Sequence, residues 1–301
     1  MMSTQPFDAA RYKAGQRWEW DTAAPRLKDW GQFLVQQLQP VSERMLELAD
    51  IQPGQRVLDV ATGGGEPAIT AAHRVGPSGH VLATDLSPQM VALGRERVAE
   101  LGLHNIDFRE MDAEAPDLPE NSFEIVLCRL GLMYLPDPQV ALQRLHQLLV
   151  PGGRLLAAVW GTPHTVPFAR WPMEVAMRVL QVPAPPPQMP GPFSLADSRR
   201  LEQLLTEAGF TAVHTEPMLL TLEWASVDDY IRFQQAILTG FNAMLAKFPA
   251  EQQADVWRAI AEAAGQSTTP DGRCRTENEV LLAVGRRWQI SFQEEKYGYD
   301  K

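Results

Sequence analysis

A strand followed by a glycine-rich turn is predicted at Val57-Leu58-Asp59-Val60-Ala61-Thr62-Gly63-Gly64-Gly65-Glu66. Its first half has the apolar, β-branched character of a buried strand, and three consecutive glycines follow. Glycines between a strand and a helix allow a tight turn and let the backbone approach a ligand closely. Because ligands of open α/β sheets bind at the carboxyl ends of the strands, this stretch predicts a nucleotide-like site after the first strand.

Short β-branched runs alternate with amphipathic segments from about residue 55 to residue 160. Strands are expected at 55–60, 80–84, 106–111, 123–128 and 154–159, and helices at 66–74, at 88–101 and from Asp137 onward. Ser87 and Pro88 form a favourable helix start, an N-cap followed by proline at the first helical position. This alternation predicts a doubly wound α/β fold, with a mostly parallel sheet covered on both faces.

The segments outside this core have a different character. Residues 1–50 are predicted to be helical and contain Trp18, Trp20 and Trp30. The segment Val182–Pro192 contains six prolines, which exclude regular structure and indicate either a linker or a loop folded over a site. Later helices are expected at 195–208, 227–248 and 250–264, and extended segments at 211–222 and 279–284. The second half is therefore predicted to complete the sheet and to add lid helices.

The composition limits the classes of function. The 301 residues contain 27 Lys and Arg and 37 Asp and Glu, which gives a formal net charge of −10. A chain this acidic repels polyanions, so we expect no nucleic-acid partner. Cys128 and Cys274 are far apart in sequence, which indicates neither a disulfide framework nor a metal site and is typical of a reducing cytosol. With no long apolar window and no apolar leader, a cytoplasmic protein without a membrane span is expected.

The acidic residue at the end of the first predicted strand helps to identify the ligand. Gly63, Gly65 and Ala68 match the GxGxxA pattern of dinucleotide sites, which leaves a nicotinamide cofactor as an alternative. A pyrophosphate, however, would meet the negative charge of Asp59 at short range. A ligand with an ammonium and a sulfonium would instead gain roughly 1–4 kcal/mol of Coulomb energy there, which favours S-adenosylmethionine. The alternative for Asp59 is that it only holds the glycine loop through backbone N–H groups.

Two further carboxylates follow the second and third predicted strands. Asp85 is placed to accept hydrogen bonds from ribose hydroxyls, a feature of both dinucleotide and S-adenosylmethionine sites. Asp112, followed by Ala113, is placed to accept the adenine amino group. The alternatives are a carboxylate at a helix entry for Asp85 and an ordinary acidic loop for Asp112.

In their order along the chain, these residues resemble the motifs of class I S-adenosylmethionine-dependent methyltransferases. The motifs are Asp59 to Gly65, Asp85, Asp112-Ala113, the strand 123–128 and Leu149-Val150-Pro151-Gly152-Gly153-Arg154. The segment Arg129-Leu130-Gly131-Leu132 is similar to that of the ubiquinone/menaquinone-biosynthesis methyltransferase-like (methyltransferase type 11) group. The resemblance covers roughly residues 50–160.

This resemblance implies a Rossmann-like sheet of seven strands, in which 211–222 and 279–284 are the last two. It divides the chain into an N-terminal helical cap (1–50), a cofactor-binding core (51–162), a region of sheet completion and acceptor-binding lid insertions (163–285) and a tail (286–301). Ala61 replaces the first glycine of the commoner pattern, which is tolerated if its φ is negative. The candidate cofactor-binding residues are Asp59, Ala61, Thr62, Gly63, Gly64, Gly65, Asp85, Leu86, Met90, Asp112, Ala113 and Arg129.

Methyl transfer from a sulfonium is an in-line displacement. The protein must align the acceptor and, for an oxygen or carbon nucleophile, remove a proton. Similar sterol and small-molecule O-methyltransferases often carry a histidine pair after the fourth strand, where this chain has Met133-Tyr134. The candidate catalytic residues are therefore His164, just after the fifth strand, and Tyr134. An exposed loop histidine is the alternative for His164, and an acidic acceptor would need no base.

The acceptor site is expected to be apolar and aromatic, which suits planar or hydrophobic small molecules. Its candidate residues, each with packing of the lid helices as the alternative, are Tyr12, Trp18, Trp20, Met133, Trp171 and Phe233. The expected function is methylation of a small aromatic or hydrophobic metabolite, on oxygen or carbon rather than nitrogen, with S-adenosylhomocysteine as the second product. The alternatives are an NAD(P)-dependent oxidoreductase and a non-catalytic S-adenosylmethionine-binding protein. A homodimer is compatible with the sequence.

Overall fold

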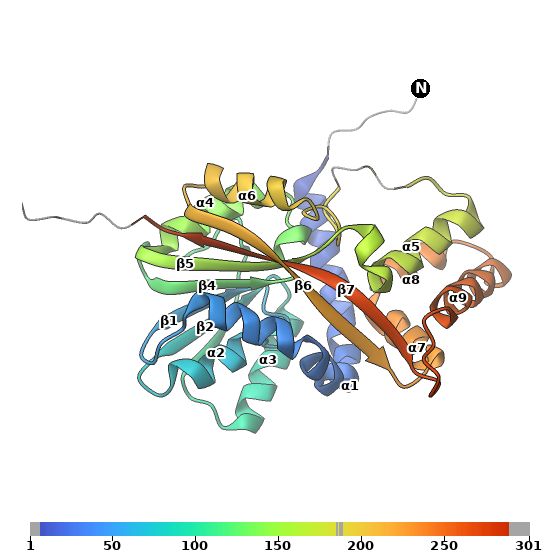
Figure 1. Ribbon diagram of the computed structural model, residues 1–301, viewed down its shortest axis with the longest axis horizontal. Coiled ribbons are helices and arrows are strands. Elements are labelled where there is room, and N and C mark those ends of the chain that lie inside the picture. Colours follow the sequence, from blue (N-terminus) through green and yellow to red (C-terminus); the bar gives the residue numbers. More distant parts are fainter. Residues whose placement is uncertain (1–6, 185, 187–188, 289–301) are drawn as a thin grey trace, which may run out of the picture.

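A computed structural model describes residues 7–184, 186 and 189–288, which form a seven-stranded sheet between helices (Figure 1). The strand order is β3-β2-β1-β4-β5-β7-β6, with β1 to β5 parallel and β7 antiparallel to both of its neighbours. The order reverses between β1 and β4, and at such a switch point the carboxyl ends of the strands leave a crevice for a ligand. The predicted fold class is confirmed. The strands are β1 (Arg56–Val60), β2 (His80–Asp85), β3 (Ile106–Glu110), β4 (Phe123–Arg129), β5 (Leu149–Trp160), β6 (Thr211–Trp224) and β7 (Cys274–Arg286).

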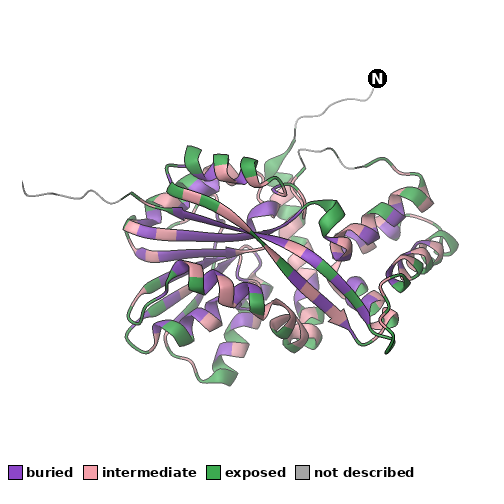
Figure 2. Ribbon diagram, viewed as in Figure 1, coloured by how far each residue is buried: buried purple, intermediate pink, exposed green. Residues whose placement is uncertain are grey.

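Helices cover both faces of the sheet. In Figure 1, α4 and α6 lie on one side, and α2, α3 and the end of α1 lie on the other. Figure 2 shows that the middle strands are mostly buried, as expected for a parallel sheet covered on both faces. The helices are α1 (Ala9–Ala49), α2 (Ala68–Val75), α3 (Pro88–Leu101), α4 (Pro138–Leu148), α5 (Pro167–Leu180), α6 (Ser198–Glu207), α7 (Val227–Ile237), α8 (Thr239–Leu245) and α9 (Ala250–Gly265), with 3-10 turns η1 (Leu132–Tyr134) and η2 (Pro163–Thr165).

The helix α1 has 41 residues and contains Pro25 and Pro40. A proline inside a helix removes a backbone hydrogen bond and bends the axis, and α1 changes direction along its course in Figure 1. Its last turns pack on the sheet, where Met45 and Leu46 are fully buried. Its first half runs past the carboxyl ends of the parallel strands and packs on α3. The expected N-terminal helix therefore covers the edge at which a ligand would bind.

The long antiparallel ribbon of β6 and β7 extends beyond the parallel strands. It pairs from Thr211–Arg286 to Trp224–Cys274. In Figure 1 its far end lies among α5, α7, α8 and α9. The described part of the chain contains no helix that is long and apolar enough to cross a membrane.

The structure corrects two of the expected elements. The helix α5 occupies Pro167–Leu180, in a region for which we predicted no helix. The helix expected at 227–248 is two helices, because α7 ends at Ile237 and α8 begins at Thr239. The helix α3 matches its prediction, and Ser87 Oγ accepts the expected N-cap hydrogen bond from Met90 N at 3.1 Å.

Candidate functional site

The glycine loop after β1 is held from below by Asp59. The Asp59 side chain is fully buried, and its Oδ2 accepts hydrogen bonds from Thr62 Oγ1 at 2.6 Å and from Ala68 N at 3.1 Å. Its Oδ1 is buried without a hydrogen-bond partner. Burial raises the pKa of this carboxyl to about 7. Asp59 therefore holds the loop, as the alternative reading proposed, and also keeps one oxygen free for a further donor.

The backbone of the loop enters the left-handed region three times. Ala61 has a φ of 55°, Gly63 of 56° and Gly65 of 101°. The expectation of a negative φ at Ala61 is therefore wrong, and this alanine is in a strained conformation. The loop also lies close to the turn after β4, since a Cβ added at Gly131 would collide with the Ala61 methyl group.

Asp85, at the end of β2, ties the glycine loop to the start of α3. It is 8% exposed, and its two oxygens accept hydrogen bonds from Gly63 N and Ser87 N, both at 2.9 Å. Burial raises the pKa of this carboxyl to about 6. Asp85, the residue predicted to bind the ribose, is thus held in place by two backbone N–H groups.

Asp112, after β3, is paired with a residue that the sequence did not single out. Lys13 Nζ, on α1, lies 2.6 Å from Asp112 Oδ2 and 2.6 Å from Glu114 Oε2. The other Asp112 oxygen accepts a hydrogen bond from Glu114 N at 2.9 Å. The Asp112 carboxylate, which was predicted to hold adenine, is therefore paired with the Lys13 ammonium.

A cavity of about 50 Å³ lies between α1 and the carboxyl ends of the first three strands. It brings together residues from five predicted segments, including four candidate cofactor residues and the candidates Tyr12 and Tyr134. Its lining is Tyr12, Lys13, Gln16, Val60, Ala61, Leu86, Met111, Asp112, Ala113, Tyr134, Leu135 and Pro136.

Polar and apolar contacts hold the first half of α1 over this cavity. Arg17 Nη1 lies 2.7 Å from Glu110 Oε1, and Ser87 Oγ donates a hydrogen bond to Asp21 Oδ1 at 2.6 Å. Below them, the predicted cofactor residue Met90 is buried in a small apolar cluster with Ala23 and Ala24 of α1. Met90 therefore supports α1 and does not line the cavity.

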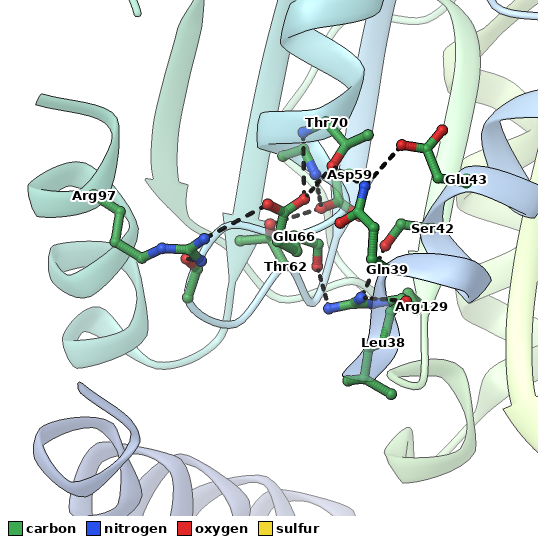
Figure 3. A network of polar contacts seen from close by, with 12 residues as sticks. Leu38, Gln39, Ser42, Glu43, Asp59, Thr62, Glu66, Thr70, Arg97 and Arg129 are labelled. Atoms are coloured by element: carbon green, nitrogen blue, oxygen red, sulfur yellow. Dashed lines mark hydrogen bonds and ion pairs between the residues drawn. The ribbon is translucent and has the colours of Figure 1, made fainter. Parts of the chain in front are cut away.

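The guanidinium of Arg129 lies between Glu66, at the end of the glycine loop, and Ser42 of α1 (Figure 3). It donates hydrogen bonds to Ser42 Oγ at 2.9 Å, to Leu38 O at 3.4 Å and to Glu66 O at 3.1 Å. Burial lowers its pKa. Within the described residues, no carboxylate oxygen forms a salt bridge with it, whereas Arg97 is paired with Glu66 at 3.5 Å. Arg129 is thus a half-buried cation at the loop, tied to α1 by two hydrogen bonds.

Tyr134 lines the cavity, and the segment before α6 lies next to it. Trp20 packs edge-on against Tyr134 with ring centroids 6.0 Å apart, and Tyr12 Oη donates a hydrogen bond to Pro190 O at 3.3 Å. The carbonyl of Met133 accepts from Gly191 N at 2.9 Å and from Ser194 Oγ at 2.7 Å. The described end of the proline-dense stretch therefore lies against the site, although Pro185, Pro187 and Gln188 fall outside the described residues.

The remaining candidates lie elsewhere. Trp18 is 50% exposed, and His164 is exposed on η2. Phe233 and Trp171 are buried in an aromatic cluster, where Phe233 contacts Trp30, Phe33, Phe168 and Trp224, and Trp171 contacts Tyr230. None of these four candidates is among the described residues that line the cavity.

Sequence reasoning missed Lys13 and Gln16, which line the cavity. Gln16 lies four residues after Tyr12 and three after Lys13, so the three share one face of a helix. That spacing was visible in the sequence. What it lacked was the bend that brings this face over the carboxyl ends of the strands.

Comparisons with known proteins fit this geometry. Residues 57–153 match the family model described as "Methyltransferase domain". The chain is 35% identical over 120 residues to the ubiquinone/menaquinone biosynthesis C-methyltransferase UbiE of Cellvibrio japonicus, covering 40% of this chain and 48% of that protein. It is 37% identical over 116 residues to the aklanonic acid methyltransferase DauC of Streptomyces sp. strain C5, covering 38% of this chain and 53% of that protein. The chain thus spans about half the length of the curated relatives that it matches.

The solved structures show a similar fold. The YcgJ protein of Bacillus subtilis superposes with a TM-score of 0.56 at 17% identity, covering 82% of this chain and 98% of that protein. Residues 57–153 therefore match a methyltransferase domain, as the motifs indicated, and the fold of the chain is similar to that of a solved structure.

Proposed function

We propose that this chain transfers a methyl group from S-adenosylmethionine to a small aromatic or hydrophobic metabolite, on oxygen or carbon rather than nitrogen. The observation that carries the proposal is the convergence of Ala61 before the glycines, Leu86 next to Asp85, and Asp112 on one cavity beneath α1. The matched methyltransferase domain covers this half of the site, and the acceptor half combines η1 of that domain with α1, which lies outside it.

The residues around the loop fit the amino-acid end of this cofactor. Asp59 keeps one buried carboxylate oxygen without a partner, and Arg129 is a half-buried cation without a carboxylate partner among the described residues. An amino acid carries one ammonium and one carboxylate, which complement these two groups. Asp85 and Asp112 then remain for the ribose hydroxyls and the adenine amino group.

Binding of the whole cofactor requires α1 to move. The cavity measures about 50 Å³, whereas sites for ligands of this size occupy about 300–1,000 Å³. Lys13 also occupies Asp112. We therefore propose that the first half of α1 is a lid that opens for the cofactor and closes over the acceptor, which would exclude water from the reaction.

The chain's own contribution to the chemistry is alignment and proton removal. A bound sulfonium supplies an activated methyl group and a neutral thioether leaving group. The protein must hold the acceptor atom in line with that methyl group. Tyr12, Trp20 and Tyr134 are the candidates that lie at the cavity or pack on its wall, and they favour a planar acceptor.

The two curated relatives support this acceptor class, since they are named for ubiquinone/menaquinone biosynthesis and for aklanonic acid. A cytoplasmic location, a homodimer, the lack of a nucleic-acid partner and the division into cap, core, lid region and tail also remain proposals.

Methyl transfer tests the proposal directly. Purified protein is incubated with S-adenosylmethionine labelled in its methyl group and with a set of hydroxylated quinones, phenols and polycyclic aromatic acids. We expect label in the organic extract with at least one acceptor. Cofactor binding without transfer to any acceptor would support the non-catalytic alternative, and binding of NADH in place of S-adenosylmethionine would support the oxidoreductase.

A further inference from the structure

A half-buried carboxylate, Glu19, lies one helical turn beyond the cavity lining on α1. Gln16, which lines the cavity, donates a hydrogen bond from Nε2 to Glu19 Oε2 at 3.4 Å. On the opposite side the Glu19 carboxylate abuts Gly240 of α8, where an added Cβ would collide with it. The Glu19 carbonyl accepts a hydrogen bond from Thr239 Oγ1 at 2.9 Å, which fixes this turn of α1 against α8.

The groups that face Glu19 are neutral. They are Gln16 and Tyr12 on α1, Tyr134 on η1, and Thr239 and Gly240 on α8. The two nearest cations along α1 are engaged elsewhere, since Lys13 pairs with Asp112 and Arg17 with Glu110. Burial raises the pKa of the Glu19 carboxyl, and no cation among the described residues offsets this effect.

The corner formed by Tyr12, Gln16 and Glu19 has hydrogen-bond acceptors without donors. Gln16 Oε1 is buried without a partner, and Glu19 receives only the long bond from Gln16. Tyr12 spends its proton on Pro190 O. Because buried acceptors without donors are costly, this corner calls for a ligand that donates hydrogen bonds.

We infer that Glu19 is the proton acceptor for a phenolic methyl acceptor bound beside Trp20 and Tyr134, an inference that rests on the proposed function. A phenolic hydroxyl suits this corner because it can donate a hydrogen bond to the acceptors that lack a donor and can give its proton to Glu19. The aromatic ring of the acceptor would lie against the Trp20–Tyr134 pair, and its hydroxyl would donate to Glu19 and Gln16.

The step balances without a further reactant. The acceptor oxygen gives its proton to the Glu19 carboxylate and uses its electron pair to form the bond to the methyl carbon. The carbon–sulfur bond breaks, and sulfur keeps that electron pair as a neutral thioether. Glu19 then releases the proton to solvent when the products leave.

The variant Glu19→Gln tests the role, because it keeps the shape and the bond to Gln16 but cannot accept a proton. With a series of phenols as acceptors, we expect kcat to fall by about 10²–10⁴-fold, with KM and the cofactor Kd within about threefold of wild type. The wild-type kcat/KM should fall on the acid side as Glu19 becomes protonated, and Glu19→Gln should lose this acid limb. Phenols with electron-withdrawing groups are already ionised at the assay pH and need no proton acceptor. With these acceptors, the kcat of Glu19→Gln should come closer to the kcat of wild type.

Two further variants separate this role from a structural one. Gly240→Ala places a methyl group against the Glu19 carboxylate without a backbone penalty, so kcat should fall while cofactor binding is retained. Glu47→Gln, on an exposed turn of the same helix, should leave kcat unchanged.

Two results would overturn the assignment. One is a folded Glu19→Gln protein that keeps wild-type kcat and the acid limb. The other is a wild type that binds S-adenosylmethionine and methylates amines or carbon acids but no phenol. Failure of the proposed function has a different signature, since the wild type would then transfer no methyl group to any class of acceptor.

Discussion

Asp59 is a buried carboxylate that the folded protein holds in its protonated form up to unusually high pH. Its pKa rises from an ordinary 3.8 to about 7 through burial, and that of Asp85 rises to about 6. The folded state therefore binds more protons than the unfolded state between about pH 4 and pH 7. Their contribution to stability is fully present below pH 4 and is lost as the pH rises through 6 and 7.

We predict that the free energy of unfolding falls as the pH rises from 5 to 8, by up to about 3 kcal/mol for Asp59. Asp59→Asn should flatten this dependence, because asparagine can accept the same two hydrogen bonds without a charge. Urea denaturation at pH 5, 6, 7 and 8 measures the effect, with the exposed Asp117→Asn as the control. Parallel pH curves for Asp59→Asn and wild type would contradict the prediction.

The glycine loop offers a pair of substitutions with opposite signs. Ala61 and Gly63 have φ angles of 55° and 56°. Ala61→Gly should raise the free energy of unfolding by about 0.5–1 kcal/mol, since relief of left-handed strain outweighs the entropy of glycine. Gly63→Ala has no atom within 4 Å of the added Cβ, so it should lower stability by about 1 kcal/mol through backbone strain alone. Urea denaturation at one pH compares the two variants, and shifts of the same sign would argue against this account of the loop.

Individual residues of the cofactor half were predictable, because a carboxylate after each parallel strand must reach the same edge of the sheet. Asp85 and Asp112 reach it. The positive φ of Ala61 was not predicted, since alanine usually avoids that region. Trp171 and Phe233 were predicted to bind substrate but lie in an aromatic cluster. Aromatic residues occur both in cores and in pockets, so the residue type alone could not distinguish the two.

Among the helices, the first half of α1 is the proposed lid over the cavity. Lys13 ties it to Asp112 and Glu114. We predict that Lys13→Met increases amide hydrogen exchange in residues 9–21, because two ion pairs over the cavity are lost. Lys28→Met removes the exposed pair with Glu96 on the same helix and should leave exchange in residues 9–21 unchanged. Equal exchange in both variants would show that Lys13 does not hold the lid.

The contact of α7 with α1 tests the role of Phe233. This side chain is 2% exposed and packs on Trp30, Phe33 and Trp224. We predict that Phe233→Ala lowers the free energy of unfolding by about 3–5 kcal/mol and leaves the cofactor Kd unchanged under conditions in which the protein is folded. Chemical denaturation and calorimetry measure the two quantities. Unchanged stability with loss of acceptor binding would restore the substrate-binding role.

Elements with strong local signals were predictable and those set by tertiary contacts were not. Ser87, Pro88 and Gly102 fix both ends of α3 through capping. The helix α5 escaped prediction because prolines at 167 and 172 are usually helix breakers, yet Pro167 stands at its first position and the helix packs on α9 and β7. The turn between α7 and α8 lies at Leu238, an apolar residue that does not interrupt the apolar periodicity of 227–248. The sequence pattern therefore predicted one helix there.

At the scale of the whole molecule, the parallel core follows from the alternation of strands and helices. The acceptor half depends on contacts between distant segments: α1, η1, α8 and the described residues before α6 meet at one corner. Glu19 and Lys13 became visible only when these segments were placed together. This division explains why the cofactor class could be inferred from the sequence and the proton acceptor could not.

We propose that the crevice at the switch point binds S-adenosylmethionine through Asp85. Isothermal titration of the wild type and Asp85→Asn with S-adenosylmethionine, S-adenosylhomocysteine and NADH tests it most directly, with thermal unfolding to confirm that the variant is folded. We predict that the wild type binds both adenosyl ligands and not NADH, and that the substitution weakens binding by about 10- to 150-fold, the effect of one charged hydrogen-bond partner. Binding of NADH alone, or equal affinity of wild type and Asp85→Asn for S-adenosylhomocysteine, would contradict it.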